Sequence, residues 1–429
     1  MFARQWRGIT QVLNESSTVT LAWVIFGMAF LTRVGWVFLL RYYQTDLDVE
    51  SEVFHVAGQF ARDFSFANPY ICPTGPTAHA PPAFPMLLGL IFRLFSPGVV
   101  RQLVLCLAGS AVSSATYAFL PWLAINLGWQ RLVGVIAGLF GAVVPLFFWI
   151  EARGIWDAPY TALFLVLGVG VSAVLNADQP VVRFARAGAV WGIGFWFAPS
   201  LLPVFLVCAA GVFWRCLPGL RALVLTAVFG ACAVILVSPW IARNYVQFHR
   251  IFWMRDNFGL ELHTSNNAEA RPIEVENREH TNSFRVHPNG RLEACLQVQR
   301  VGEISYFQEQ QREAMAWIRS NPEQFVHLSA DRAWYFWFVP LASPLKRVGS
   351  AVLTVLCFAG IALCWKQYGA RLLLAVLLFY SGIYYFIQMD PRFRYPIHPL
   401  ILLGAAALVP HFAKRSILTG SLERTTASN

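Results

Sequence analysis

"TVTLAWVIFGMAFLTRVGWVFLL", Thr18–Leu40, is an almost unbroken apolar run whose one charged residue is Arg33. About 20 mostly apolar residues span the hydrocarbon core of a bilayer, and this run is too long for the core of a signal peptide. Comparable runs recur along the chain as far as His411. The sequence therefore predicts an all-α, multi-pass membrane protein with about ten transmembrane helices.

Composition and charge support this class. Of the 429 residues, 57% are apolar and 13% are charged, whereas about 25% of residues are charged in an ordinary soluble domain. The net charge is +10, but the basic residues lie mostly between apolar runs rather than in one stripe. The positive-inside rule explains this placement better than nucleic-acid binding does. We therefore expect both termini in the cytoplasm, the lipid bilayer as a partner and no nucleic acid.

The pattern divides the chain into three parts: an N-terminal transmembrane module (1–242), a polar segment (243–329) and a C-terminal transmembrane module (330–429). The first module contains a long outer loop, 43–82. Helices are predicted at 19–42, 97–126, 131–150, 157–176, 187–214, 222–241, 348–365, 370–388 and 394–412, with a short re-entrant or interfacial segment at 83–95. The 187–214 helix should break at "FAPS", and the polar segment should end in two helices separated by Asn321-Pro322. The long loops then emerge on one, non-cytoplasmic face.

An acidic segment follows the first helix, in "TDLDVESEVFHVAGQFA". It contains Asp46, Asp48, Glu50 and Glu52. If it is helical, Asp48 and Glu52 share one face, because residues four apart are neighbours on a helix. Carboxylates at a membrane surface bind a cation or deprotonate a hydroxyl. The alternative is a solvated acidic cap at a helix N-terminus.

A stiff segment, "PTGPTAHAPPAFP" at Pro73–Pro85, leads back into the membrane. Its prolines fix the direction of the chain, and stiffness keeps a site assembled without support from a helix. We expect it to place His79 near the acidic segment, as a group that binds or orients a substrate. The alternative is a rigid connector without chemistry.

Ionisable residues also mark three outer ends of helices. They are Asp157 in "WIEARGIWDAP", Arg243 and Asn244 in "SPWIARNYVQF", and Arg392, Arg394 and Tyr395 in "MDPRFRYPIHPL". Asp157 either acts on a substrate or marks the water line. Arginine on an outer face requires an anionic partner, and guanidinium forms a bidentate fork with phosphate oxygens. That phosphate belongs either to a lipid substrate or to bulk lipid headgroups.

Two of the eight cysteines, Cys72 and Cys295, fall in long extramembrane segments. They are able to pair if those segments face an oxidising compartment. The other six lie in or beside apolar runs, where packing is the ordinary role.

The order of these motifs resembles the GT-C class of polyprenyl-phosphate-sugar-dependent glycosyltransferases, specifically bacterial relatives of the protein O-mannosyltransferases and of the lipid A aminoarabinose transferase. The likeness spans Glu50 to Leu408. It lies in "ESEVFHVAGQFA", "NPYICPTGPTAHAPPAFPMLLGLIFRLF", "IWDAPYTALFLVL", "SPWIARNYVQFHRIFWMRDNFGLELHTSNN", "AWIRSNPEQFVHLSADRAWYFW" and "DPRFRYPIHPLILLGAAAL".

The resemblance implies a GT-C helical bundle in the inner membrane. Its activity would be transfer of a hexose or pentose, with inversion, from a polyprenyl-phosphate donor to a protein, lipid or glycan acceptor on the non-cytoplasmic face. It implies that Asp48 or Glu52, and less so Asp46 or Glu50, serves as the base or as a ligand of Mg²⁺ or Mn²⁺. Relatives have an adjacent Asp-Glu pair there, whereas this chain has alternating acids. The resemblance further places Arg243, Arg392 and Arg394 near the lipid phosphate.

Two other functions fit the same features. A glycan ligase or polymerase with a diphosphate-linked donor also combines many helices with a large outer loop. A transporter would require polar residues deep within several helices, and Arg33 is one of few such residues here. The chain shows no internal repeat of the kind that many transporters have.

Overall fold

The structure, a computed structural model, describes residues 17–44 and 51–410. These residues form helices joined by turns, and their only β pairing is two isolated bridges, Ala67 with Pro76 and Ile273 with Met389. Seven described helical segments are long and apolar enough to cross a membrane, and three more are apolar but shorter. The predicted all-α multi-pass class is confirmed.

Eleven helices build the membrane bundle. They are α2 (Thr18–Leu39), α5 (Val99–Ala118), α6 (Leu120–Asn126), α7 (Arg131–Val143), α9 (Ala158–Ala173), α10 (Val181–Phe197), α11 (Leu202–Cys216), α12 (Leu220–Phe248), α18 (Pro344–Leu363), α19 (Tyr368–Ser381) and α21 (His398–Ala406). Among these eleven helices, the largest interfaces pair α10 with α12, α2 with α5 and α18 with α21. Apolar side chains of these helices form one continuous buried core.

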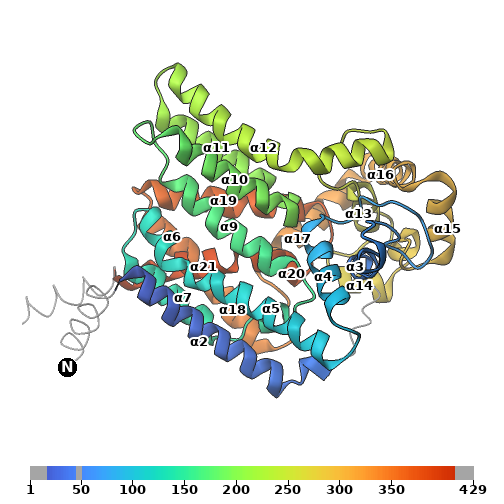
Figure 1. Ribbon diagram of the computed structural model, residues 1–429, viewed down its shortest axis with the longest axis horizontal. Helices are drawn as coiled ribbons and strands as arrows, with labels where there is room; N and C mark the ends of the chain where they lie inside the picture. Colours follow the sequence, from blue (N-terminus) through green and yellow to red (C-terminus); the bar gives the residue numbers. More distant parts are fainter. Residues whose placement is uncertain (1–16, 45–50, 411–429) are drawn as a thin grey trace, which may run out of the picture.

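The remaining helices are short or lie outside the apolar runs. They are α3 (Glu52–Asp63), α4 (Ala83–Leu94), α8 (Phe148–Glu151), α13 (Phe258–Ser265), α14 (Glu274–His280), α15 (Leu292–Val301), α16 (Glu303–Ser320), α17 (Pro322–Trp337) and α20 (Pro391–Arg394), with 3₁₀ turns η1 (Tyr42–Gln44), η2 (Pro199–Leu201), η3 (Ser283–Val286), η4 (Gly382–Tyr385) and η5 (Tyr395–Ile397). Figure 1 shows α3 and α13–α16 gathered at one end of the bundle, which we call the polar end.

Proline explains where the predicted helices break. The expected break in 187–214 lies at Ala198, which is extended before Pro199 and separates α10 from α11. The helix predicted at 131–150 is shorter than expected, because Val144 before Pro145 is extended and α7 ends at Val143. A residue before proline is disfavoured in the helical region. The helix pair around Asn321-Pro322 is confirmed by α16 and α17.

Two helices of the polar end, α13 and α16, approach each other closely along their backbones. A Cβ on Gly259, in α13, would lie 2.1 Å from the carbonyl oxygen of Phe307 in α16. Only glycine permits this contact without displacing one of the helices. Helix α13 therefore packs directly on α16, and both support the residues described below.

One ion pair lies inside the membrane bundle. Arg33 of α2 contacts Glu151 of α8 at 2.6 Å, and both side chains are fully buried. Tyr117 donates a hydrogen bond to Glu151 Oε1 at 2.7 Å, and the Arg33 guanidinium lies over the rings of Tyr117 and Phe148. A charge in hydrocarbon is costly unless it is paired, so this contact joins α2 to α8 as part of the core.

Candidate active site at the polar end

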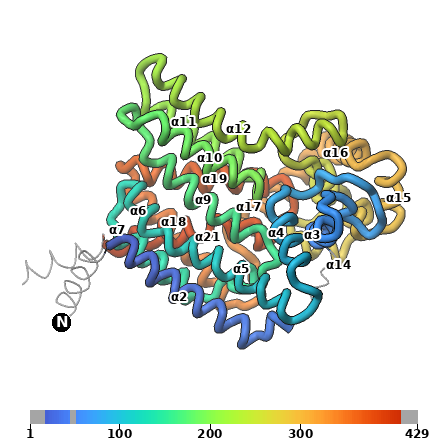
Figure 2. Tube along the Cα trace, in the orientation of Figure 1, coloured from blue at the N-terminus to red at the C-terminus, as the bar shows by residue number. Residues whose placement is uncertain are grey.

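The stiff segment Pro73–Pro85 is tied to the polar end at its start. Cys72 forms a disulfide with Cys295 of α15, which confirms that these two cysteines pair. Gln299 of the same helix donates to the carbonyl of Pro73 at 2.9 Å. In Figure 2 the blue loop after α3 runs beside α15, in orange. The covalent link holds the first outer loop to a helix that follows it by more than half of the chain.

Glu303, the first residue of α16, holds the middle of this segment. Its buried carboxylate accepts hydrogen bonds from Thr77 Oγ1 at 2.6 Å, Ala78 N at 2.7 Å and Tyr70 OH at 3.3 Å. Burial raises the pKa of Glu303 to about 7, although the three hydrogen bonds lower it. A carboxyl with that pKa changes charge in the neutral range.

Arg243 holds the segment from the membrane side. It lies within α12, which extends beyond its predicted end to Phe248. Its guanidinium donates to the carbonyls of Thr77 at 2.7 Å and Phe66 at 2.9 Å, and it lies over the Trp240 ring. The neighbouring Asn244 is fully buried and accepts from Arg243. These contacts make Arg243 a clamp on the segment that carries His79.

His79 lies in a group of polar side chains beside Glu52. Its Nδ1 is 3.1 Å from Tyr70 OH, and its ring centroid is 6.2 Å from that of His287. His287 Nε2 is in turn 3.6 Å from Glu52 Oε1. His287 therefore contacts both His79 and Glu52, the one described residue of the acidic segment.

Glu52 begins α3, and Ser51 before it is extended (φ −118°, ψ 148°) and caps the helix. The helix thus starts at the last of the four acids of this segment. Asp46, Asp48 and Glu50 lie outside the described residues.

Arg255 is the central cation of this region. It acts electrostatically on His79, Asp157 and Glu261. Its Nε donates to Asn257 Oδ1, and no carboxylate within residues 17–44 and 51–410 forms an ion pair with it. Burial raises the pKa of Asp157 and Glu261, and Arg255 opposes the rise in both. An arginine so placed has donors to offer to an anionic ligand.

Arg392 and Arg394 have different surroundings. Arg392 donates to Glu274 Oε2 at 2.8 Å, lies 3.6 Å from Asp390 Oδ1 and covers the Trp156 ring. Burial raises the pKa of Asp390 to about 6, against the effect of Arg392. Arg392 thus joins α20, which precedes the last described helix of the membrane bundle, to α14 in the polar end.

Arg394 is fully buried. Its guanidinium donates to Thr354 Oγ1 at 2.9 Å and lies 3.3 Å from His398 Nδ1. Tyr395 beside it is buried against Phe147. These two residues face the interior of the bundle, so Arg392 is the member of the pair that lies at the polar end.

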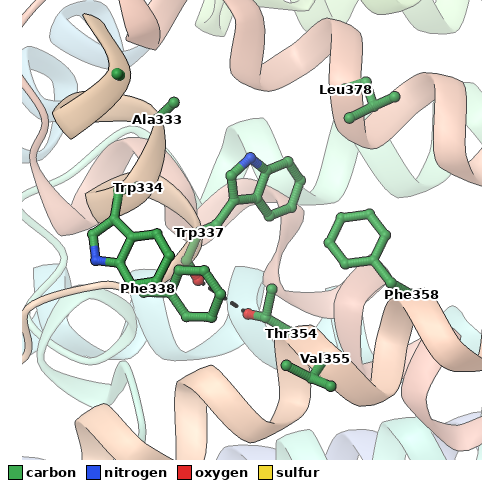
Figure 3. A pocket seen from close by; sticks show the side chains of 9 residues that line it. Ala333, Trp334, Trp337, Phe338, Thr354, Val355, Phe358 and Leu378 are labelled. Atoms are coloured by element: carbon green, nitrogen blue, oxygen red, sulfur yellow. Dashed lines mark hydrogen bonds between the residues drawn. The ribbon is translucent and has the colours of Figure 1, made fainter. Parts of the chain in front are cut away.

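An apolar groove of about 370 Å³ lies between α17, α18 and α19. Figure 3 shows Trp334, Trp337 and Phe338 on one side, facing Val355 and Phe358, with Leu378 across the opening. Thr354 in its wall donates to the carbonyl of Trp337 at 3.1 Å and accepts from Arg394. Thr354 thus joins the wall of the groove to Arg394 of α20.

Five residues of this region were not predicted: Tyr70, Arg255, Glu261, His287 and Glu303. One sequence signal points to Glu303: it follows Cys295 closely in the sequence, and a disulfide from Cys295 to Cys72 brings α15 to the proline segment. Arg255, in "WMRDN", has no spacing that distinguishes it from an ordinary loop residue.

The described part of the chain contains no group of three or more His, Cys, Asp or Glu side chains arranged to hold a metal ion. Glu303 is engaged by the proline segment and Glu274 by Arg392. The described donors alone therefore do not fit a resident divalent cation.

Three solved structures from Archaeoglobus fulgidus resemble this one. The oligosaccharyltransferase in its apo form matches with a TM-score of 0.55 and 15% identity, over 96% of this chain and 52% of that one. The oligosaccharyltransferase AglB in complex with an inhibitory peptide and a dolichol-phosphate gives 0.52 and 14%, over 94% and 52%. The complex with Zn and sulfate gives 0.52 and 15%, over 93% and 51%.

No protein-family model matches the chain, and no curated protein matches it either. The chain spans about half the length of the solved structures that it resembles. At this level of identity the likeness is one of fold. The chain has the helical membrane fold of these oligosaccharyltransferases, the GT-C type of bundle expected from its sequence.

Proposed function

We propose that this protein is a membrane glycosyltransferase that moves a sugar from a polyprenyl-phosphate donor to a hydroxyl or amine of a protein, lipid or glycan acceptor. One observation carries the proposal: acidic side chains lie near Arg255 at one end of a bundle with this fold. Arg255 itself has no ion-pair partner among the described residues. Sugar transfer from a lipid phosphate needs a base for the acceptor and cations for the departing phosphate.

Glu52 is the described candidate for the base. It lies 3.6 Å from His287 Nε2, and His287 Nδ1 accepts from the backbone N–H of Asn289. Nε2 of the neutral imidazole therefore carries the proton and faces the carboxylate, which orients Glu52. Asp48, Asp46 and Glu50 remain alternative bases.

Arg255 is our first choice for holding the phosphate as it leaves, with Arg392 and Asp157 at the border of the same region. A guanidinium that keeps free donors stabilises the charge that develops on the phosphate oxygens. Arg243 and Asn244 support the site through the proline segment, and Arg394 and Tyr395 support it from within the bundle.

The groove between α17, α18 and α19 would receive part of the polyprenyl chain. Its lining is almost entirely apolar and aromatic, and Trp334 at its edge is 61% exposed. Buried isoprenoid surface adds binding free energy without discriminating between sugars. One of the similar structures is a complex with a dolichol-phosphate, which favours a lipid-linked donor for this chain as well.

In this proposal the polar end faces the periplasm or cell exterior, from a bacterial inner membrane. A divalent cation, Mg²⁺ or Mn²⁺, remains a prediction of the resemblance, and one similar structure is a complex with Zn. The described residues supply no ligand set for it.

The test begins with mass spectrometry of lipids that remain bound to the gently solubilised protein. We expect a polyprenyl-phosphate sugar, and we expect purified protein in vesicles to release polyprenyl monophosphate when an acceptor is added. Release of a diphosphate would instead establish the ligase or polymerase alternative. Movement of substrate across the vesicle membrane without sugar transfer would establish a transporter and overturn the proposal.

A further inference from the structure

Three buried side chains form a hydrogen-bonded chain that ends at the candidate active site. Glu303 Oε2 accepts from Tyr70 OH at 3.3 Å, and Tyr70 OH is 3.1 Å from Nδ1 of His79. All three side chains are between 4% and 6% exposed. The chain runs from the start of α16 through the first outer loop to the proline segment.

The hydrogens of this chain can be placed by counting donors. The backbone N–H of His79 donates to Thr77 Oγ1 at 3.0 Å, so the Thr77 hydroxyl hydrogen is free to go to Glu303. With Ala78 N and Tyr70 OH, the carboxylate then accepts three hydrogen bonds, as an ionised carboxylate does. Because the hydroxyl of Tyr70 has one hydrogen and gives it to Glu303, its oxygen accepts from His79 Nδ1–H.

A neutral imidazole with its proton on Nδ1 has an unprotonated Nε2. His79 Nε2 makes no hydrogen bond with any residue of the described ranges. Burial, then Arg255 and His287, lower the pKa of His79 well below its ordinary value, so the ring is neutral at neutral pH. His79 therefore presents a hydrogen-bond acceptor beside His287 and Glu52.

We propose that His79 Nε2 binds the substrate by accepting a hydrogen bond from one of its O–H or N–H groups, and that Tyr70 and Glu303 are positioning residues that fix this tautomer. The inference rests on the proposed function for the identity of that substrate. It makes His79 selective, because a substrate that lacks the donor leaves a buried acceptor unsatisfied.

The same chain makes binding depend on pH. When Glu303 is ionised, Tyr70 donates to it and His79 Nε2 stays unprotonated. When Glu303 is protonated, its hydroxyl can donate to Tyr70, and Tyr70 then donates to His79 Nδ1, which moves the imidazole proton to Nε2. Since burial raises the pKa of Glu303 to about 7, the binding tautomer is present above that pH and is lost as the pH falls through it.

The charged and titratable groups around Glu303 are few. Asp256, whose backbone N–H donates to Ala78 O, raises the pKa of Glu303 electrostatically. Arg243 interacts with Glu303 from α12. Burial also raises the pKa of Asp256, to about 6, so this acid becomes charged before Glu303 does as the pH rises.

The decisive substitution is Glu303→Gln. The amide keeps the shape of the side chain and can still accept from Ala78 N, but its NH₂ group donates to Tyr70 at every pH. Tyr70 must then donate to His79 Nδ1, and Nε2 carries the proton permanently. Glu309→Gln, at a partly exposed position on the same helix, is the matched control.

The first readout is independent of activity: nitrogen-15 NMR of histidine-labelled full-length protein in nanodiscs at pH 8, with His79 assigned by its loss in His79→Phe. We expect the Nδ1–H tautomer in the wild type and in Glu309→Gln, and the Nε2–H tautomer in Glu303→Gln. An Nε2–H tautomer in the wild type overturns the positioning role of Tyr70 and Glu303.

The second readout is sugar transfer. We expect Glu303→Gln and His79→Phe each to raise KM for the substrate that His79 binds, the donor or the acceptor, by about tenfold, since one hydrogen bond is lost. His79→Gln, which keeps an acceptor atom, should restore part of the lost affinity. The rise of affinity with pH around 7 should vanish in Glu303→Gln.

Unchanged KM for both donor and acceptor in His79→Phe overturns the binding role and leaves the proposed function standing. No transfer by the wild type with any polyprenyl-phosphate sugar overturns the proposed function and the binding role together, whereas the tautomer result still decides the hydrogen-bonded chain.

Discussion

Glu52 Oε1 lies 3.6 Å from His287 Nε2, which joins the start of α3 to the loop between η3 and α15. The disulfide between Cys72 and Cys295 and the Glu303 contacts hold the first outer loop to the same end of the molecule. The pair thus connects two parts of the chain that are separated in the sequence by most helices of the membrane bundle. It is also the point at which our assignment of the base can be tested most directly.

Glu52→Gln should lower kcat for sugar transfer by about 100-fold or more, because general bases contribute about 10²–10⁴. Steady-state kinetics in vesicles measures the loss. Glu279→Gln, on the exposed side of α14, is the control and should keep wild-type rates. Full activity in a folded Glu52→Gln protein would move the base to Asp48, for which Asp48→Asn is the corresponding variant.

Arg255→Gln should lower kcat/KM for the donor by about 10- to 100-fold, since a hydrogen bond to a charged group is worth about 1.5–3 kcal/mol. Arg255→Lys should recover only part of the loss, because an ammonium lacks the planar fork. Arg285→Gln, at an exposed position of the polar end, serves as the control. Donor kinetics unchanged in Arg255→Gln would exclude this residue from the phosphate site.

The membrane fold was predictable because it depends on local pattern. Long apolar runs specify spans by themselves, and Pro199 and Pro322 mark breaks through their own backbone restrictions. The helix pair α16 and α17 and the break between α10 and α11 follow from such signals. Helix ends were less predictable. Helix α12 continues to Phe248 through polar residues, and these residues are stabilised by packing against the proline segment.

The candidate site was only partly predictable, because it is assembled by contacts between distant segments. His79 near the acidic segment was expected from stiffness and order alone, and the structure brings it beside His287, which in turn lies 3.6 Å from Glu52. The roles of Arg255 and Glu303 depend on neighbours that are distant in the sequence, so local spacing does not predict them. Arg394 illustrates the reverse: its position in "DPRFRYP" indicates an outer face, yet its side chain packs within the bundle against Thr354.

Cys72→Ser/Cys295→Ser should lower the free energy of unfolding by about 2–5 kcal/mol, as loss of a native disulfide does. Part of the effect should appear as increased proteolysis in the first outer loop, which the disulfide ties to α15. Thermal unfolding followed by Tm, with limited proteolysis, measures both. Cys232→Ser, a free and partly exposed cysteine of α12, is the control. An unchanged Tm in the double variant would show that the bond adds no stability.

Glu151→Gln should destabilise the protein by about 3–5 kcal/mol, because Arg33 would be left as an uncompensated buried charge. Replacing both partners, in Arg33→Met/Glu151→Gln, should cost less than the single change, since no buried charge remains. Tm values of the two single variants and the double variant complete a double-mutant cycle. Strict additivity of the three would mean that the pair contributes no interaction energy.

Filling the groove between α17, α18 and α19 tests whether a lipid chain occupies it. Val355→Trp places an indole in the groove, whereas Val352→Trp places one on an exposed part of α18 outside the groove lining. If the indole displaces about two methylene groups of a bound chain, KM for a long-chain donor should rise by about tenfold, at about 0.8 kcal/mol per methylene.

A donor whose chain is too short to reach the groove should show no such change, and Val352→Trp should behave as the wild type with both donors. Equal effects of Val355→Trp on long and short donors would mean that the substitution acts through the fold. Unchanged kinetics with the long donor would place the chain elsewhere on the bundle, because an occupied groove of about 370 Å³ does not accept an indole without losing part of its ligand.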